Sequence, residues 1–271
     1  MKNLVQIICG CGAAETIEEC ARVPLSLGAT IIVVHGIWPR LNHPSSDAAN
    51  DYSDPSRWVS PTHQIDNVAE IAQRNGWHFI QMDKFAFNGE QYNVALAYIR
   101  AHAIPCDTIW FVDSDECIDP ADTPTLLAEV ELFRQHGVGS VRFHKRTEIV
   151  RDWRGFSYDI TGGNYGIVMG AALQLERETY FDGNFFFKTP ISYGLTSVPL
   201  LHLHHFRKNA ASRVHDGIWE GGGMKVDLST VPALPETDYI RALKAKYTGF
   251  HEDTGEYYLG NAVYAGKEGQ L

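Results

Sequence analysis

The sequence lacks a long hydrophobic segment. Its 271 residues contain no run of about 18 apolar residues, the length that would predict a membrane-spanning helix. The start carries one positive side chain, Lys2, and a short apolar run at residues 4–9, soon followed by Glu15 and Glu18. Such a beginning is typical of a first strand and not of a secretory signal. We therefore predict a protein without a membrane span.

Cysteine is scarce and shows no metal-binding or disulfide pattern. The five cysteines are odd in number, and their spacing fits neither a disulfide framework nor a zinc motif: Cys9, Cys11, Cys20, Cys106 and Cys117. Reduced thiols in a cytoplasmic protein are the resulting prediction.

Positive charge is also in short supply. Lys and Arg number 23 against 33 Asp and Glu, which gives a formal net charge of −10. This balance argues against a broad nucleic-acid-binding surface, although a local basic patch between Arg142 and Arg154 stays open. Apolar residues make up 44% of the chain. That is enough for one large domain, or for one domain with an appendage.

Strand and helix patterns alternate through the first half of the chain. Apolar or alternating runs predict strands at residues 4–9, 30–34, 78–82, 108–112 and 140–144. Helix patterns begin near Glu15, Ser60, Asn88 and Thr123, of which the last three suit an N-cap, and a further helix covers 237–247. Residues 36–57 are rich in Pro, Ser, Asn and Asp and indicate a long loop. We therefore predict an α/β fold with a mainly parallel central sheet and helices on both faces.

The pattern changes after residue 145, where glycine and aromatic residues become frequent. We interpret residues 145–215 as the acceptor-side half of the same domain. The predicted organisation is a domain at 1–215 and a C-terminal extension at 216–271 that packs on it.

The most informative segment is an acidic run directly after the predicted strand at 108–112. It carries Asp113, Asp115 and Glu116. In open α/β sheets, ligands bind beyond the carboxyl ends of strands. Three acids gathered there repel one another unless a cation joins them, and Mg²⁺ and Mn²⁺ prefer carboxylate oxygens. The segment predicts a metal-bridged diphosphate substrate; the alternative is an acidic turn that leads into the next helix.

At this point the sequence resembles family 2 glycosyltransferases and related enzymes of the GT-A type. The run 113–116, Asp-Ser-Asp-Glu, resembles their Asp-x-Asp-Glu motif. Three further segments resemble family segments in the same order: 15–20 after the first strand, 90–96 with Asn93 before the metal motif, and 205–208 with His205, Arg207 and Lys208. The resemblance covers residues 1–215 and implies a GT-A nucleotide-sugar-binding fold.

The resemblance implies roles for the two aspartates. Asp113 is expected to contact the nucleotide ribose or the metal, and Asp115 to bind the Mn²⁺ or Mg²⁺ that bridges the donor diphosphate. A fixed cation there would neutralise the charge that develops on the leaving group. The expected partners are a nucleotide sugar, with UDP as nucleotide, and an unknown hydroxyl acceptor: a glycan, a small molecule or a modified biopolymer.

Other positions complete the expected site, some of them with departures from the family. Glu15, Asn93 and Asp47, the last as a shifted counterpart of a Ser-x-Asp segment, are candidates for donor binding. His35-Gly36 stands where the family usually has an Asp, and Tyr92 where an Arg is common.

Histidines gather at 202, 204 and 205, and a strand over 200–204 would place His202 and His204 on one face. We expect His205 to complete the metal shell, with Arg207 and Lys208 close to the donor phosphates. A catalytic base is expected among the carboxylates of the second half. Asp182 is our candidate, with Glu176, Glu178 and Asp159 as alternatives; each also fits a solvated surface acid.

Three rival functions remain at this level. A nucleotidyltransferase also pairs acids with a metal and phosphates, but it would use a nucleoside triphosphate. A metal hydrolase could use the histidine cluster as a zinc site. A sugar-binding module without catalysis would have no need of the acid cluster.

Overall fold

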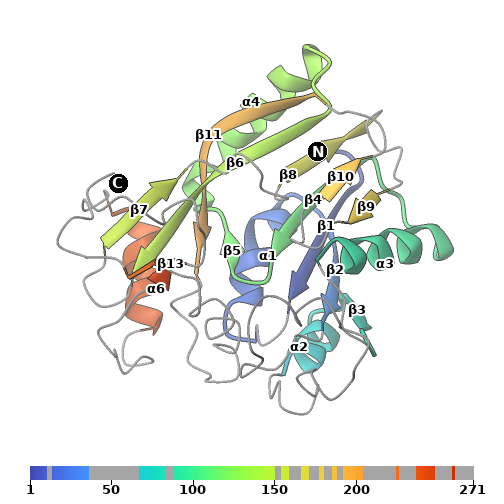
Figure 1. The fold of residues 1–271 in the computed structure, drawn as a ribbon, viewed down its shortest axis with the longest axis horizontal. Helices are drawn as coiled ribbons and strands as arrows, with labels where there is room; N and C mark the ends of the chain where they lie inside the picture. The colour runs from blue at the N-terminus through green and yellow to red at the C-terminus, as the bar shows by residue number, and fades with distance from the viewer. Residues whose placement is uncertain are drawn as a thin grey trace.

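The computed structural model contains a nine-stranded sheet with helices packed on it (Figure 1). It describes residues 1–10, 14–36, 67–83, 88–149, 154–158, 166–170, 177–179, 185–187, 192–203, 224–225, 236–247 and 258–259.

Four parallel strands form one half of the sheet, in the spatial order β3-β2-β1-β4. Their bounds are β1 Leu4–Gly10, β2 Thr30–His35, β3 His78–Gln81 and β4 Thr108–Asp113. In the middle of this half, Ile7 of β1 lies opposite Ile32 of β2 and Phe111 of β4. Because all four strands run in one direction, their carboxyl ends meet at one edge of the sheet.

The other half mixes strand directions and continues the order as β8-β6-β11-β5, with β7 paired to β6. The bounds are β5 Glu116–Cys117, β6 Ser140–Ile149, β7 Arg154–Tyr158, β8 Gly166–Met169 and β11 Tyr193–His202. β8 is antiparallel to both β4 and β6, so β6 and its parallel partner β11 run in the same direction as β4. The carboxyl end of β11 therefore reaches the same edge as the end of β4.

Two small two-stranded sheets lie outside the main one. They pair β9 Arg177–Thr179 with β10 Phe185–Phe187, and β12 Met224–Lys225 with β13 Tyr258–Leu259.

Helices cover both faces of the sheet. Their bounds are α1 Ile17–Ser26, α2 Val68–Arg74, α3 Asn88–Ala101, α4 Thr123–Gln135 and α6 Asp238–Tyr247, with a 3₁₀ turn η3 at Pro120–Asp122. Buried residues of α1, α2 and α4 share one hydrophobic cluster, and those of α3 belong to a second. This arrangement confirms the predicted α/β fold class.

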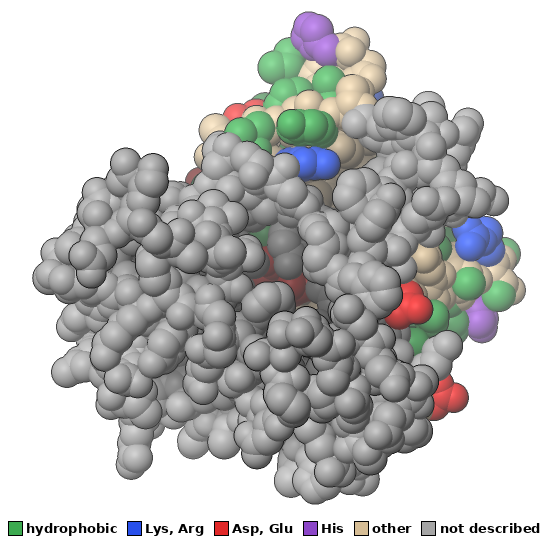
Figure 2. Space-filling view, viewed as in Figure 1, with side chains coloured by type: hydrophobic (Ala, Val, Ile, Leu, Met, Phe, Trp, Pro, Cys, Tyr) green, Lys and Arg blue, Asp and Glu red, His purple; other side chains and the backbone are tan. Residues whose placement is uncertain are grey.

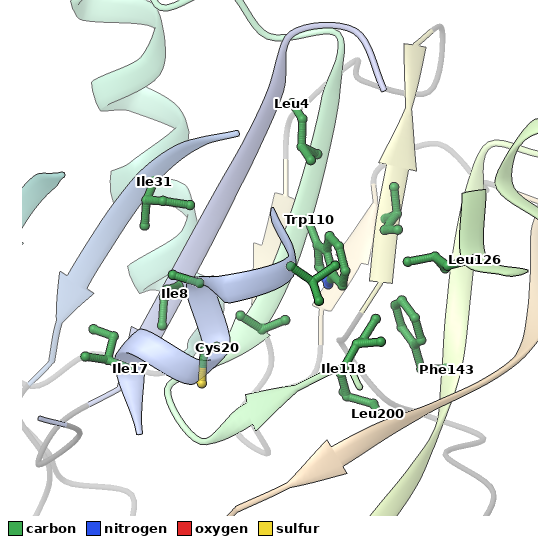
Figure 3. Packing of buried hydrophobic residues seen from close by; sticks show 14 of the residues in the cluster. Leu4, Ile8, Ile17, Cys20, Ile31, Trp110, Ile118, Leu126, Phe143 and Leu200 are labelled. Carbon is green, nitrogen blue, oxygen red and sulfur yellow. The ribbon is translucent and has the colours of Figure 1, made fainter. Parts of the chain in front are cut away.

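The alternation of side chains along β1 explains why every residue from Leu4 to Cys9 except Gln6 is apolar. Leu4 and Ile8 point into the cluster with α1 and α4, as Figure 3 shows, whereas Ile7 and Cys9 belong to the cluster with α3. A strand whose two faces are both covered by helices needs apolar residues at successive positions. Trp110 of β4 and Phe143 of β6 stack at 5.8 Å between ring centroids in the first cluster.

Several predicted boundaries need correction. Thr123 is the first residue of α4 and not its cap, because the η3 turn places Asp122 at the N-cap position. The strand predicted at 140–144 extends to Ile149, where β7 pairs with it. β11 ends at His202 and Leu203 follows outside the strand, so the strand predicted at 200–204 ends earlier than expected. The predicted helix start at Ser60 lies outside the described residues.

A bulge interrupts the pairing of β11 with β6. Leu195 lies opposite Arg142 and Pro199 opposite His144, so β11 has extra residues between the two pairs. Glu129 of α4 holds this bulge: its carboxylate accepts hydrogen bonds from the Ser197 backbone N–H at 3.0 Å and from the hydroxyls of Thr196 and Ser197. Burial raises the pKa of Glu129, but these hydrogen bonds outweigh it and hold the pKa below the usual range.

Candidate functional site

The carboxyl ends of β1, β2 and β4 form a continuous edge held by backbone hydrogen bonds. The Gly36 N–H donates to the Gly10 carbonyl at 2.8 Å, and the Ser114 N–H donates to the Cys9 carbonyl at 2.9 Å. Acidic side chains are visible near the centre of the face shown in Figure 2. This edge is where open α/β sheets bind ligands.

The acidic run forms a tight turn between β4 and β5, which we call the acidic turn (residues 113–116). Asp113 ends β4 and is half-buried, whereas Asp115 and Glu116 have only 4% and 0% of their surface exposed. Buried carboxylates are costly unless hydrogen bonds or cations compensate them. The folded protein therefore has to supply such partners for Asp115 and Glu116.

Helices on opposite faces of the sheet hold the turn and the residue before it through backbone carbonyl groups. The Thr16 hydroxyl, at the start of α1, donates to the Ser114 carbonyl at 2.7 Å. The hydroxyl of Tyr92, on α3, donates to the Val112 carbonyl at 3.0 Å. Thr16 occupies the N-cap position of α1 but makes no cap hydrogen bond there, because its hydroxyl is used on the turn.

The turn is also closed from inside and from the side of β11. The Asp113 N–H donates to Oε2 of Glu116 at 3.0 Å, across the turn. The Leu203 N–H donates to the Asp115 carbonyl at 2.6 Å, and in the antiparallel pair β5–β11 His202 lies opposite Glu116. The histidine-rich segment thus passes directly beside the acidic turn as far as residue 203.

A glycine allows the turn to approach β1. Gly10 has φ +150°, and a Cβ added there would lie 2.1 Å from Oγ of Ser114. A side chain at position 10 would therefore push the acidic turn away from the end of β1.

Two candidates for donor binding neighbour residues that support the turn. Glu15 is half-buried and precedes Thr16, and Asn93 is half-buried and follows Tyr92. Five further candidates lie outside the described residues: Asp47, Asp182, His205, Arg207 and Lys208. Glu178, an alternative base, lies on β9, opposite Phe186 of β10.

The end of β2, where His35 replaces the expected Asp, is joined to β3. Nδ1 of His35 is 2.9 Å from Oε1 of Gln81, and the Gln81 amide donates to the Met82 carbonyl at 2.9 Å. His35 is 5% exposed. A Cβ at Gly36 would lie 2.5 Å from Nε2 of Gln91, so α3 packs tightly against this strand end. The sequence departure at 35–36 corresponds to a packed junction of β2, β3 and α3.

Helix α6 supports the acidic turn from behind β5. Ile240 and Leu243 pack in one cluster with Cys117, Leu201 and Leu203. Helix α6 therefore packs against both strands that carry the segments next to the turn.

A buried acid, Glu19, joins α6 to α1. Its carboxylate accepts hydrogen bonds from Arg22 at 2.8 Å, Lys246 at 2.6 Å and the Tyr239 hydroxyl at 3.0 Å. Burial raises the pKa of Glu19, but the hydrogen bonds and charges of Arg22 and Lys246 outweigh it and lower the pKa to about 2. The Tyr239 hydroxyl also lies 3.7 Å from Sγ of Cys117, which links this ion pair to β5.

The sequence does not predict the residues that hold the turn. Tyr92 stands where the family commonly has an Arg, but it is wholly buried and packs edge-on against Phe111, with 4.8 Å between the ring centroids. Thr16 could have been noticed as a hydroxyl residue at the start of a helix that follows the first strand. No sequence signal identifies Leu203, because its role rests on a backbone N–H.

Within the described part of the chain, no group of three or more His, Cys, Asp or Glu is arranged to hold a metal ion. The donor chemistry of Asp113 and Asp115 nevertheless fits a hard divalent cation, since Mg²⁺ usually takes one or two carboxylates together with substrate phosphates. None of the described helices is long and apolar enough to span a membrane.

No protein-family model and no curated protein sequence matches the chain. Among solved structures, S. aureus TarS 1–349 is 13% identical with a TM-score of 0.44, over 93% of this chain and 72% of that chain. The complex of S. aureus TarS 1–349 with UDP-GlcNAc is 13% identical with a TM-score of 0.43, over 93% of this chain and 73% of that chain. In another S. aureus TarS structure, 53% of this chain matches only 22% of that chain, at 15% identity and a TM-score of 0.32.

A cytidylyltransferase from Leptospira borgpetersenii is 14% identical with a TM-score of 0.31, over 62% of this chain and 61% of that chain. Similarities of this size do not transfer an activity to this chain.

Proposed function

We propose that this protein transfers a sugar from a UDP-sugar to a hydroxyl group of an acceptor, in a reaction that requires Mn²⁺ or Mg²⁺. The observation that carries the proposal is the acidic turn. Asp113 and Asp115 stand at the carboxyl end of β4, beside β1, on a backbone held by α1, α3 and Leu203. Fixed carboxylates at this edge suit a ligand that brings phosphate oxygens to a shared cation.

Asp115 and Asp113 would hold the cation, with His205 as a further ligand. The bound cation would act as a Lewis acid and neutralise the charge that develops on the leaving diphosphate. The stability of the turn matters for this role, because a site that is already organised needs no rearrangement as the glycosidic bond breaks.

The remaining roles follow from the resemblance to family 2 glycosyltransferases. Asp182 would accept the proton of the acceptor hydroxyl. Glu15, Asp47 and Asn93 would contact the donor, and Arg207 and Lys208 its phosphates. The acceptor is a glycan, a small molecule or a modified biopolymer.

A thermal-shift screen tests donor binding. A ligand that binds only the native state raises the melting temperature by mass action. We expect UDP or a UDP-sugar to give the largest shift among nucleoside diphosphates, and a larger one with Mn²⁺ than with EDTA. If no nucleoside diphosphate shifts the melting temperature at millimolar concentration, the proposal is wrong.

Product analysis then separates the enzyme classes. Transfer releases UDP from a UDP-sugar, whereas a nucleotidyltransferase releases pyrophosphate from a nucleoside triphosphate. Full activity in excess EDTA would contradict the metal requirement in either case.

Substitution of the histidines tests the metal shell. We expect His205→Ala to weaken Mn²⁺ binding and turnover, with little change in stability without metal, because a neutral imidazole is a good ligand for Mn²⁺. His202→Ala and His204→Ala are the matched controls and should have smaller effects. An unchanged Mn²⁺ affinity in His205→Ala would remove this residue from the site.

A further inference from the structure

The carboxylate of Glu116 makes a hydrogen bond within the acidic turn itself. Its side chain is wholly buried, and Oε2 accepts the Asp113 backbone N–H at 3.0 Å. A hydrogen bond from a backbone N–H to a carboxylate is stronger than one between neutral groups. This bond joins the first and the last residue of the turn.

The backbone of Glu116 is fixed independently of this bond. Glu116 begins β5 and lies opposite His202 of β11, and Cys117 lies opposite Leu201. Helix α6 packs behind this pair through Ile240 and Leu243. Glu116 therefore links β11 and α6 to the backbone of Asp113, which stands at the other end of the turn.

We propose that Glu116 is a positioning residue for the cation site, and that it acts by accepting the Asp113 N–H and not by binding the cation. The inference rests on the proposed function, because it assigns Asp113 and Asp115 to the cation. The hydrogen bond from the Asp113 N–H to Glu116 holds the Asp113 backbone in place, and the Asp113 carboxylate extends from that backbone. The affinity for Mn²⁺ then depends on an acceptor atom at position 116 and little on its charge.

Two substitutions at position 116 separate an acceptor from a charge. In Glu116→Gln the side-chain carbonyl can still accept the Asp113 N–H, whereas Glu116→Leu fills a similar volume and removes the acceptor. We expect the Gln variant to keep Mn²⁺ affinity within about threefold, and the Leu variant to lose about 10- to 100-fold, as is typical when the hydrogen-bond partners of ligands are removed.

The readout is the dissociation constant of Mn²⁺ measured by calorimetry with saturating UDP, together with kcat and KM for the UDP-sugar. Glu129→Leu is the matched control, because the Glu129 carboxylate also accepts a backbone N–H, that of Ser197 at 3.0 Å. Ser197 lies on β11 five residues before His202, the residue opposite Glu116. We expect this control to lower the melting temperature and to leave the Mn²⁺ affinity unchanged. If Glu116 acts by positioning Asp113, Glu116→Leu should lower kcat more than it raises KM.

The outcomes are distinguishable. A wild-type protein that binds no Mn²⁺ overturns the proposed function and this inference with it. A wild-type protein that binds Mn²⁺, with equal losses of tenfold or more in the Gln and Leu variants, makes Glu116 a ligand or a required charge and overturns the inference alone. Unchanged affinity in both variants also overturns it. If Glu116→Leu does not fold, the Gln variant decides: a tenfold loss refutes the role.

Discussion

Two regions with buried acids lie close to β5, and the structure treats them differently. At Glu19, two cations and a tyrosine hydroxyl surround one carboxylate, so the side chain is the group that is satisfied. In the acidic turn, the hydrogen bonds from Thr16, Tyr92 and Leu203 go to backbone carbonyls. The first region uses an acid to join two helices. The second holds a backbone so that Asp113 and Asp115 stand in a defined place.

This difference predicts that changes around Glu19 mainly alter stability, whereas changes at the turn mainly alter ligand binding.

The largest expected effect is the loss of transfer in Asp115→Ala. The substitution removes a proposed ligand and relieves repulsion among the acids of the turn, so the melting temperature without metal should stay the same or rise. Turnover and melting temperature are measured on the same preparation, with Glu131→Ala, an exposed acid of α4, as control. Full turnover in Asp115→Ala would contradict the proposed difference between the two regions, because Asp115 would then have no catalytic role.

Gly10→Ala should affect both stability and binding. The new Cβ would meet Ser114 Oγ at 2.1 Å, and we expect a loss of about 2–4 kcal/mol in the free energy of unfolding from overpacking and backbone strain. Gly28→Ala is the matched control: Gly28 has φ +76° but nothing within 4 Å of a Cβ, so it reports strain alone. Urea unfolding measures both. Equal losses would show that the turn yields freely to the added methyl group.

The double variant Gly10→Ala with Ser114→Gly sharpens this test. Removing the Ser114 side chain should restore part of the stability, since the clash disappears and only strain remains. No recovery would mean that the Ser114 contact is not the source of the loss.

Glu19→Gln should lower the free energy of unfolding by about 1–3 kcal/mol at pH 7, because it weakens bonds to Arg22 and Lys246, whose side chains are about half exposed. The pKa of Glu19 is lowered from 4.5 to about 2 in the folded state. Its contribution is therefore present above about pH 5 and lost as the pH falls towards 2. Urea unfolding of both proteins at a series of pH values should show their difference shrinking over that range. A difference that grows on acidification would contradict the assignment.

The smallest expected effects come from one chemical change made in both regions. Tyr92→Phe and Tyr239→Phe each remove one hydroxyl, and each should cost about 1 kcal/mol of stability. Tyr92→Phe should also weaken Mn²⁺ binding a few-fold, since it frees the Val112 carbonyl next to Asp113. Tyr239→Phe should leave Mn²⁺ binding unchanged. Equal Mn²⁺ affinities in the two variants would erase the distinction between the regions.

The sequence predicts the first half of the fold well because its signals are local. Leu4–Gly10, Thr30–His35 and Thr108–Asp113 are apolar runs of strand length, and each is covered by helices on both faces. The insertion of β8 between β4 and β6 could not be predicted, because strand pairing depends on contacts between distant segments. The boundary proposed between residues 215 and 216 stays a prediction, although α6 packs on β5 and β11.

The candidate site divides in the same way. The run from Asp113 to Glu116 is visible in the sequence, since clustered acids after a strand are unusual without a ligand. The residues that support the turn are not visible in the sequence. Thr16 is 98 residues before Ser114, whose carbonyl it contacts, and Leu203 follows β11. The hydrogen bond from the Asp113 N–H to Glu116 is likewise a matter of geometry, because nothing in the sequence distinguishes the Glu116 carboxylate from its two neighbours.

The joining of α1 to α6 has a consequence for synthesis on the ribosome. Glu19 and Lys246 are 227 residues apart, and Tyr239 meets Glu19 across 220. The parallel strands β1 to β4 can assemble once residue 113 has emerged, but β5 must wait for β11 and α6 to be translated. Since domains generally fold from the N-terminus during synthesis, the nascent chain passes through a stage in which Thr16 and Tyr92 can hold the acidic turn but β11 and α6 do not yet support it. Chains that stop before residue 236 should lack the support of α6, so a helix encoded near the end of the chain completes a site encoded near its middle.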